Sequence, residues 1–298
     1  MDWFIFALLA PVIWGLDNLI DKYFLMKLIK DPFSYQILVS ISDVLFLPVI
    51  LLFVKPSLSY PWYIISIFLG MILEFAFVLY NKAIMIEETS RVVTMFYLNP
   101  IIVLPLAYVF IGELLSISKY VGVLLLVLSA LLISYQKSKK KFRLSPALFY
   151  ILILDLIWAC HDVFSKYLFG FFDYFSFLFW SIIGAMTGAF IFLCFSKLRR
   201  NFINEVSKSD KKKVIFWRVF HAFSYYAAVL LFYFAISNGP ISLVAAIPSV
   251  QPLFVLIYTI IVGSFMPKVF SEKNSKLTFF IKILSVFLIF IGTWLAVS

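Results

Sequence analysis

Long apolar segments recur along the whole chain of 298 residues and are separated by short polar gaps. The hydrocarbon core of a bilayer is about 30 Å thick, and about 20 mainly apolar residues cross it as a helix. The pattern therefore predicts an all-α polytopic membrane protein with ten transmembrane helices. The predicted spans are residues 3–25, 34–54, 61–83, 89–111, 116–135, 147–169, 174–196, 214–237, 241–263 and 277–297.

The polar residues within these segments reveal an internal repeat. The stretch Ile13–Tyr23 (IWGLDNLIDKY) returns as Ile157–Tyr167 (IWACHDVFSKY), and residues 79–100 resemble residues 231–252. We therefore predict two five-helix repeats, residues 1–138 and 139–298. Because five is odd, the second repeat enters the membrane from the opposite side, which is the inverted topology of many secondary transporters. A duplicated packing unit without transport is the alternative.

Composition and charge agree with a membrane protein. The chain is 64% hydrophobic and only 13% charged, whereas about a quarter of the residues in a soluble domain are charged. Of the 25 Lys and Arg, 22 lie on the side of the odd-numbered loops. Lys and Arg gather in cytoplasmic loops, so the count predicts cytoplasmic odd loops and extracytoplasmic termini. The net charge of +10 then reflects orientation in the bilayer, and no nucleic-acid partner is expected.

Motifs of cofactor and enzyme chemistry are missing from the sequence. It contains no Gly-rich phosphate loop and no zinc-hydrolase or serine-hydrolase signature. Cys160 and Cys194 lie inside apolar segments, at a spacing that suits neither a disulfide framework nor a metal site. We therefore expect no enzymatic activity, no cofactor and no metal.

Several predicted spans contain ionisable residues. A charged side chain in the middle of a membrane helix costs roughly 2.5–3.5 kcal/mol, so it usually faces a cavity or a partner. The acids outnumber the bases, which favours a cationic or zwitterionic substrate. Asp43 and Asp155 could instead tie helices together. The residues concerned are Asp17, Asp21, Asp43, Glu74, Asp155 and Asp162, against Lys22, Lys166, His161 and His221.

The spacing of these charges leaves two interpretations of Asp17 open. Asp17 and Asp21 are four residues apart and share a helix face, as do Asp162 and Lys166, which suits an ion pair. Asp17 is then either a proton-accepting or cation-binding carboxylate, or a structural ion-pair partner of Lys22 or Lys166.

Prolines interrupt the fourth and ninth spans at matched positions, Pro100 and Pro105 against Pro248 and Pro252. Such paired interruptions point to a transporter site. The polar residues beside them join the charged and aromatic candidates of the other spans. The predicted substrate-binding residues are Trp14, Asp17, Asn18, Glu74, Tyr80, Tyr97, Asn99, Trp158, His161, Asp162, Tyr226 and Gln251. The candidates for carrying a coupling proton are Asp17, Asp21, Glu74 and His161.

The chain resembles the drug/metabolite transporter superfamily of the EamA type. The resemblance lies in Trp14-Gly15 with Trp158-Ala159, in Asn99-Pro100 with Gln251-Pro252, and in Gly112-Glu113. It implies a central cavity lined by spans 1, 3, 4, 6, 8 and 9 and opened alternately to each side. The substrates of the family include amino acids, amines, nucleobases, sugars and nucleotide conjugates. Two features depart from the family: Gly263-Ser264 stands where Gly-Glu often recurs, and family members usually have cytoplasmic termini.

The expected function is secondary transport of a small polar, amino-acid-like or amine-like metabolite by alternating access, with a proton as the candidate coupling ion. The expected partners are that small molecule and the bilayer, and a monomer is compatible with the sequence. A lipid flippase or an intramembrane protein acting on a lipid headgroup is the alternative, and a sensor that does not transport is a third hypothesis. A cavity open sideways to the bilayer would favour a lipid, and an aqueous vestibule would favour a soluble metabolite.

Overall fold

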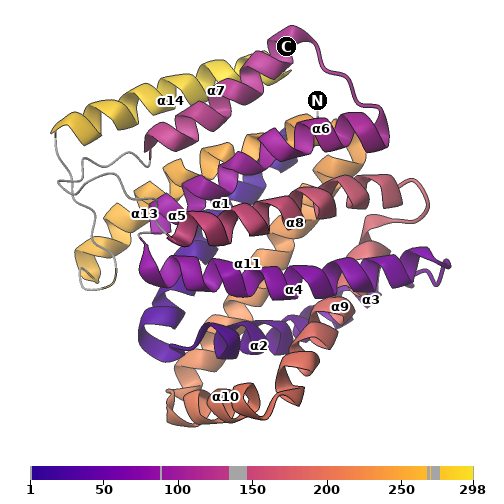
Figure 1. Ribbon diagram of the computed structural model, residues 1–298, viewed down its shortest axis with the longest axis vertical. Helices are drawn as coiled ribbons and strands as arrows, with labels where there is room; N and C mark the ends of the chain where they lie inside the picture. Colours follow the sequence, from indigo (N-terminus) through magenta and orange to yellow (C-terminus); the bar gives the residue numbers. More distant parts are fainter. Residues whose placement is uncertain (1, 88, 134–145, 267–268, 270–275, 298) are drawn as a thin grey trace.

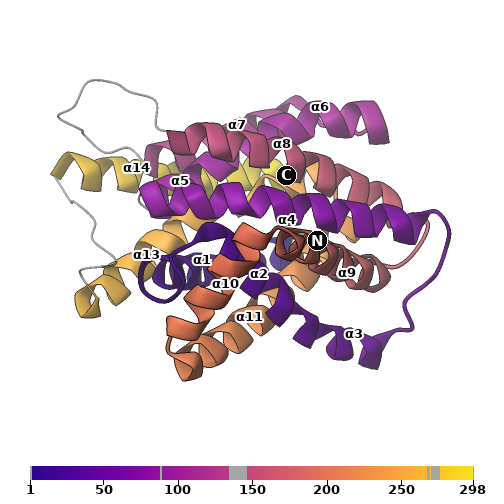
Figure 2. The same ribbon diagram turned by 60° about the horizontal axis from the view of Figure 1, so that its bottom comes forward.

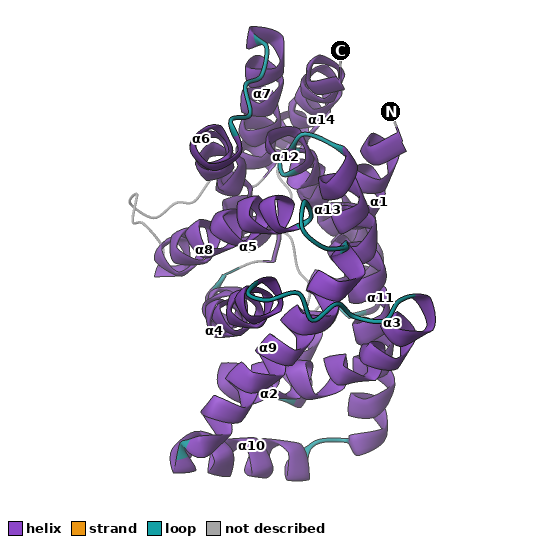
Figure 3. Cartoon of the chain, turned by 90° about the vertical axis from the view of Figure 1, so that its right-hand side faces the viewer, coloured by secondary structure: helices purple, strands orange, loops and turns teal. Residues whose placement is uncertain are grey.

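The computed structural model describes residues 2–87, 89–133, 146–266, 269 and 276–297. This part of the chain is almost entirely helical and contains no strand (Figure 3). In chain order the elements are α1 (Asp2–Tyr23), η1 (Phe24–Leu28), α2 (Pro32–Asp43), η2 (Val44–Phe46), α3 (Leu47–Phe53), α4 (Trp62–Ile86), α5 (Thr89–Met95), η3 (Phe96–Leu98), α6 (Asn99–Ile111), α7 (Ile117–Ile133), α8 (Pro146–Leu168), α9 (Tyr174–Cys194), α10 (Ser196–Lys208), α11 (Lys211–Asn238), α12 (Ile241–Val244), η4 (Ile247–Val250), α13 (Gln251–Phe265) and α14 (Lys276–Val297).

Within the described residues, seven helical stretches are long and apolar enough to cross a membrane, and two further apolar helices are shorter. Each of the ten predicted spans falls mainly on helical residues, and the count of ten membrane crossings stays a prediction. The seven stretches are Trp3–Leu28, Pro32–Phe53, Trp62–Ile86, Pro146–Leu168, Tyr174–Cys194, Lys211–Asn238 and Ile241–Phe265.

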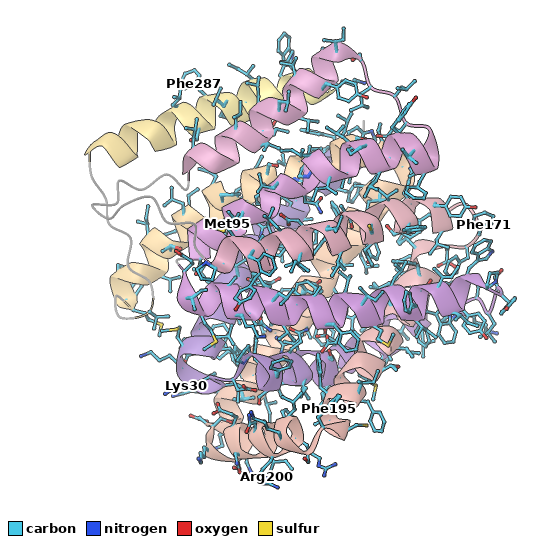
Figure 4. All side chains as sticks on the ribbon, viewed as in Figure 1. Lys30, Met95, Phe171, Phe195, Arg200 and Phe287 are labelled. Atoms are coloured by element: carbon cyan, nitrogen blue, oxygen red, sulfur yellow. The ribbon has the colours of Figure 1, made fainter. Side chains whose placement is uncertain are left out.

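Apolar side chains cover much of the outside of the helical bundle. Figure 4 labels three of them, Phe171, Phe195 and Phe287, which are 48%, 60% and 64% exposed. Monomeric soluble proteins rarely expose continuous apolar surface on this scale. The outer surface and the long apolar helices together define an integral membrane protein.

The helices pack with an internal symmetry. Helix α1 packs against α11 and α13, and α8 packs against α4 and α6. The first helix of each predicted repeat thus contacts the third and fourth spans of the other repeat. Helices α7 and α14 lie side by side at one edge of the bundle (Figures 1 and 2).

Two of the helices are interrupted where the sequence predicts it. The 3₁₀ segments η3 and η4 precede α6 and α13, and Pro100 and Pro252 occupy the first turns of these helices. Proline is tolerated there because the first N–H groups of a helix have no intrahelical acceptor. Tyr97 in η3 has a non-helical backbone, with φ −89° and ψ 18°. The polar residues of both interruptions therefore face the interior at irregular backbone.

The second helix of each half begins with the same cap. The Asp31 carboxylate accepts hydrogen bonds from the Ser34 backbone N–H and hydroxyl, at 2.8 and 2.7 Å. The Asp173 carboxylate accepts the same two bonds from Ser176, at 2.8 and 2.6 Å. The motif Asp-x-Phe-Ser is thus a further element of the repeat.

Helix α6 ends at Gly112, whose φ of 73° lies in the left-handed region that favours glycine. The next residue, Glu113, accepts hydrogen bonds from the backbone N–H groups of Ile241 and Ser242, both at 2.9 Å. A carboxylate at these N–H groups complements the positive end of α12. The Gly112-Glu113 motif therefore connects the first half of the chain to the interrupted helix of the second half through hydrogen bonds of Glu113.

The basic gap after α9 contains an additional helix, α10, which the sequence analysis treated as a loop. It packs against α2 and α9 along one edge of the bundle (Figure 1). The Glu205 carboxylate accepts a hydrogen bond of 2.8 Å from the backbone N–H of Lys30, in the loop before α2. Helix α10 thus connects the two halves at this edge.

Helices α4 and α9 cross at two glycines. A Cβ atom added to Gly70 would lie 2.1 Å from the carbonyl oxygen of Ser181, and one added to Gly184 would lie 2.0 Å from that of Ile67. The two backbones are therefore in direct contact at this crossing, which no other residue type would allow.

Candidate functional site

A cavity of about 180 Å³ lies at the centre of the bundle. All twelve predicted substrate-binding residues line it, and so does Asp21. Equivalent residues that are 144 to 152 positions apart in sequence, such as Trp14 and Trp158, face the same space from the two halves of the chain. The volume is below the roughly 300–1,000 Å³ of pockets for drug-sized ligands, so it suits a small metabolite.

The cavity has more walls than the resemblance implied. Tyr35, Gln36 and Asp43 of α2 line it, and so do Ser181 and Ile182 of α9. Spans 1, 3, 4, 6, 8 and 9 line the cavity as the resemblance implied, and spans 2 and 7 contribute in addition.

Asp21 is held by three side chains from three other helices. It accepts hydrogen bonds from the hydroxyls of Tyr35 (2.5 Å) and Tyr80 (3.2 Å), and His221 Nε2 lies 3.1 Å from its Oδ1 atom. Both carboxylate oxygens are engaged, so Asp21 joins α1 to α2, α4 and α11.

Asp43 pairs with a base that the sequence analysis overlooked. Arg218 on α11 is 2% exposed, and its Nη2 atom lies 3.2 Å from Asp43 Oδ1. Tyr226 donates to the second oxygen at 2.9 Å. Asp43 thus links α2 to α11, which is one of the roles expected for it. Arg218 lies close to the basic residues at the start of α11, so the sequence alone does not distinguish it from the charges of the preceding loop.

Asp17 keeps one carboxylate oxygen without a partner. The carboxyl is 2% exposed and accepts a hydrogen bond of 2.6 Å from Ser224 at Oδ1, while Oδ2 has none. The alternative of a structural ion pair with Lys22 or Lys166 is wrong, because Ser224 takes that place and both lysines donate to backbone carbonyls.

Glu74 presents a second such oxygen. Gln36 donates to its Oε2 atom at 2.8 Å, Asn81 in turn donates to Gln36 at 2.8 Å, and Oε1 has no partner. A Cβ atom on Gly188 of α9 would lie 2.9 Å from Glu74 Cγ, so the glycine makes room for this side chain. The carboxyl group is therefore held in position, and only one of its two oxygens accepts a hydrogen bond.

His161 and Asp162 form a pair in the opposite wall of the cavity. His161 Nδ1 lies 3.5 Å from Asp162 Oδ1, and the imidazole packs beside the rings of Phe177 and Tyr233. The predicted ion pair between Asp162 and Lys166 is wrong. Lys166 instead donates to carbonyl groups at the end of α11, because those acceptors are left unpaired by the helix geometry.

A chain of hydrogen bonds joins the two interrupted helices to Asp21. Tyr97 donates to Gln251 (2.5 Å), Gln251 to Asn18 (2.5 Å), and Asn18 to Tyr80 (2.8 Å), which donates to Asp21. Asn99 is the repeat partner of Gln251 but takes no part in this series of hydrogen bonds. Its side chain donates instead to the backbone carbonyl of Asp155 at 3.2 Å.

Aromatic rings form the remaining walls. Trp14 packs edge-on against Phe232, with ring centroids 5.2 Å apart, and its Nε1 atom has no acceptor. Trp158 packs against Phe77 and Phe96 at 5.3 and 5.6 Å. The cavity thus combines aromatic faces, which attract cations, with carboxylate oxygens and the unpaired indole N–H of Trp14. Among the described residues no group of three or more His, Cys, Asp or Glu could hold a metal ion.

Residues 1–135 match the model of the EamA-like transporter family. Over these residues the chain is similar to that family, which lies within the drug/metabolite transporter superfamily, and the resemblance predicted this. The family consists of membrane transporters and not of enzymes.

A comparison with solved structures gives a likeness over nearly the whole chain. One such structure, described only as the crystal structure of a protein, is 12% identical, with a TM-score of 0.64. The alignment covers 99% of this chain and 94% of the other. At this identity the likeness shows the fold alone. No curated protein matches the sequence.

Proposed function

We propose that the protein is a secondary transporter that moves a small cationic or zwitterionic, amine-like or amino-acid-like metabolite by alternating access. The observation that carries the proposal is the central cavity, in which Asp17 Oδ2 and Glu74 Oε1 lack hydrogen-bond partners. A buried carboxylate oxygen without a donor is costly. A bound ammonium group or a proton relieves that cost.

The substrate lies between Trp14 and Trp158, with its ammonium group at Asp17. The unpaired Nε1 of Trp14 and the imidazole of His161 are the donors for a substrate carboxylate. None of the described residues that line the cavity is Lys or Arg, so no Lys or Arg side chain of this lining occupies the place of a cationic substrate. The surplus of acids over bases around the cavity supports this substrate charge.

In this proposal ten membrane helices form two inverted five-helix halves, which rock about the cavity. The exchange of packing partners between α1 and α8 supports the inversion, since each contacts the third and fourth spans of the other half. Coupling then uses a proton that is bound inside the bundle. Glu74 is the best placed of the cavity groups because Gln36 and Asn81 hold it in position.

The test is transport by purified protein in proteoliposomes. A thermal-shift screen with amino acids, amines, nucleosides and sugar nucleotides first identifies a substrate. Asp17→Asn should then lower uptake by about tenfold to a hundredfold, since a hydrogen bond to a charged group contributes about 1.5–3 kcal/mol. Expression and melting temperature should be retained.

The matched control is Asp210→Asn at the exposed start of α11, where the carboxylate caps the helix and pairs with the exposed Lys213. This variant should transport like the wild type. Unchanged uptake by Asp17→Asn would remove Asp17 from the site. Movement of fluorescent lipids between leaflets, without uptake of any soluble compound, would overturn the proposal in favour of a lipid flippase.

A further inference from the structure

Asp155 on α8 is the most isolated ionisable group among the described side chains of the bundle. It is 0% exposed, and neither oxygen of its carboxyl group has a hydrogen-bond partner. It does not line the central cavity. The sequence left open that Asp155 links two helices, but such a link requires a hydrogen-bond donor or a cation on the second helix. A buried polar group without one calls for a physical explanation.

The surroundings of Asp155 offer no compensating charge. Helix α8 packs against α4, α5, α6, η3 and α12. Among the described titratable side chains of those elements, none donates a hydrogen bond to the carboxyl group of Asp155. The side chains considered are Tyr63, Glu74, Tyr80, Lys82, Tyr97 and Tyr108.

Asp155 lies beside the interruption of the fourth span. The Asn99 side chain, in the first turn of α6, donates to the backbone carbonyl of Asp155 at 3.2 Å. Tyr97, two residues earlier, has the non-helical backbone of η3, and its hydroxyl donates to Gln251. The Asn99 amide thus bonds to the backbone of Asp155 and the Tyr97 hydroxyl to Gln251, and neither donates to the carboxyl group.

An ionised carboxylate without donors inside a membrane is expensive, so this arrangement suits the neutral acid. We propose that Asp155 is a proton-binding site outside the substrate cavity and that it carries the proton that couples transport. This inference rests on the proposed function, because coupling requires transport. It adds a group that was not among the expected coupling residues.

The proton is released when the interruption at η3 rearranges. The O–H bond of the Asp155 carboxylic acid breaks, and the proton passes to water on the side to which the site opens. The amide of Asn99 and the hydroxyl of Tyr97 then turn to donate to the carboxylate. Because Tyr97 leaves Gln251 in this step, the change reaches Asn18 in the substrate cavity.

Infrared spectroscopy of the protein in lipid vesicles tests the protonation without any substrate. The C=O stretch of a protonated acid that accepts no hydrogen bond lies above that of hydrogen-bonded acids. We expect such a band in the wild type, its loss in Asp155→Asn and its retention in Glu74→Gln. A spectrum of Asp155→Asn that keeps every protonated-carboxyl band would show that Asp155 is ionised and overturn the proposal.

Transport in proteoliposomes tests the coupling, with radiolabelled choline as the organic-cation probe. A gradient of about one pH unit can drive at most about tenfold accumulation per proton. Asp155→Asn should abolish this accumulation while equilibrium exchange of choline persists. Full pH-driven accumulation by Asp155→Asn would overturn the proposal, and so would dependence on sodium in place of the pH gradient.

The two proposals fail in different ways. If the wild type moves neither choline nor any compound from the thermal-shift screen, the proposed function fails. A wild type that transports but accumulates nothing in response to pH leaves transport intact and contradicts only the role of Asp155.

Discussion

Lys22 and Lys166 occupy equivalent positions in the two halves and make equivalent contacts. Lys22, at the end of α1, donates to the backbone carbonyl of Ile84 near the end of α4. Lys166, at the end of α8, donates to that of Ile236 near the end of α11, at 2.6 Å. Ile84 and Ile236 are themselves equivalent in the repeat. The repeat thus reproduces a specific contact, and not only a hydrophobic pattern.

These two lysines should stabilise the protein through the helix ends. A cation near the last carbonyls of a helix complements its dipole and contributes about 0.3–2 kcal/mol. We expect Lys22→Met and Lys166→Met each to lower the melting temperature of the purified protein. Lys212→Met, at an exposed position, is the control and should not change it. Equal melting temperatures for all three variants would contradict the capping role.

The buried pair of Asp43 and Arg218 should show strong energetic coupling. Removing one partner of a buried ion pair leaves an uncompensated charge and costs about 3–5 kcal/mol. Asp43→Leu and Arg218→Met should therefore each destabilise the protein severely, and the double variant should cost less than their sum. Denaturant titration in detergent micelles measures the cycle.

The exposed pair of Lys213 and Asp210 provides the comparison. Its two atoms are 3.4 Å apart, but both side chains are solvent-accessible. Lys213→Ala should cost about 0–1 kcal/mol. Strictly additive effects at Asp43 and Arg218 would show that the buried pair contributes no coupling.

The crossing of α4 and α9 should tolerate no side chain at Gly184. The added Cβ would meet a backbone carbonyl of Ile67, which cannot move without separating the helices. Overpacking in a close-packed core typically costs about 1–3 kcal/mol, and backbone contact places this site at the upper end. Size-exclusion chromatography should show little folded Gly184→Ala protein.

Gly188→Ala should behave differently, because its added methyl group meets the side chain of Glu74. We expect this variant to fold and to lose transport, since Glu74 is displaced from the cavity. A folded, fully active Gly188→Ala protein would argue against a functional position of Glu74.

The orientation in the membrane follows from the basic loops. With 22 of the 25 Lys and Arg on one side, both termini should be extracytoplasmic. An epitope tag at the C-terminus should therefore react with antibody on intact cells. Labelling that requires permeabilisation would reverse the orientation and match the usual arrangement of the family.

Much of the candidate site could be predicted because charge is rare inside membrane helices. Every apolar segment predicts a helix, and an ionisable residue in the middle of one is expected to point inward for the same energetic reason. Asp17, Glu74 and His161 meet this expectation and line one cavity.

Pairing between helices could not be predicted in this way. Spacing favoured Asp162 with Lys166, but the lysine reaches the end of another helix. Arg218 could not be recognised as a buried residue because it follows a run of lysines. Only the packing of the helices shows that it is buried beside Asp43. The contribution of α2 and α9 to the cavity likewise depends on how the helices cross.

The hydrogen bonds from Tyr97 to Asp21 all point in the same direction. Each member gives its hydrogen to the next, so four bond dipoles add together with their positive ends toward Asp21. A carboxylate accepts hydrogen bonds and cannot donate one, so Asp21 at the end of the row fixes the direction of every bond before it. The row therefore has a single polarity, and Asp21 orients polar groups from both halves of the protein.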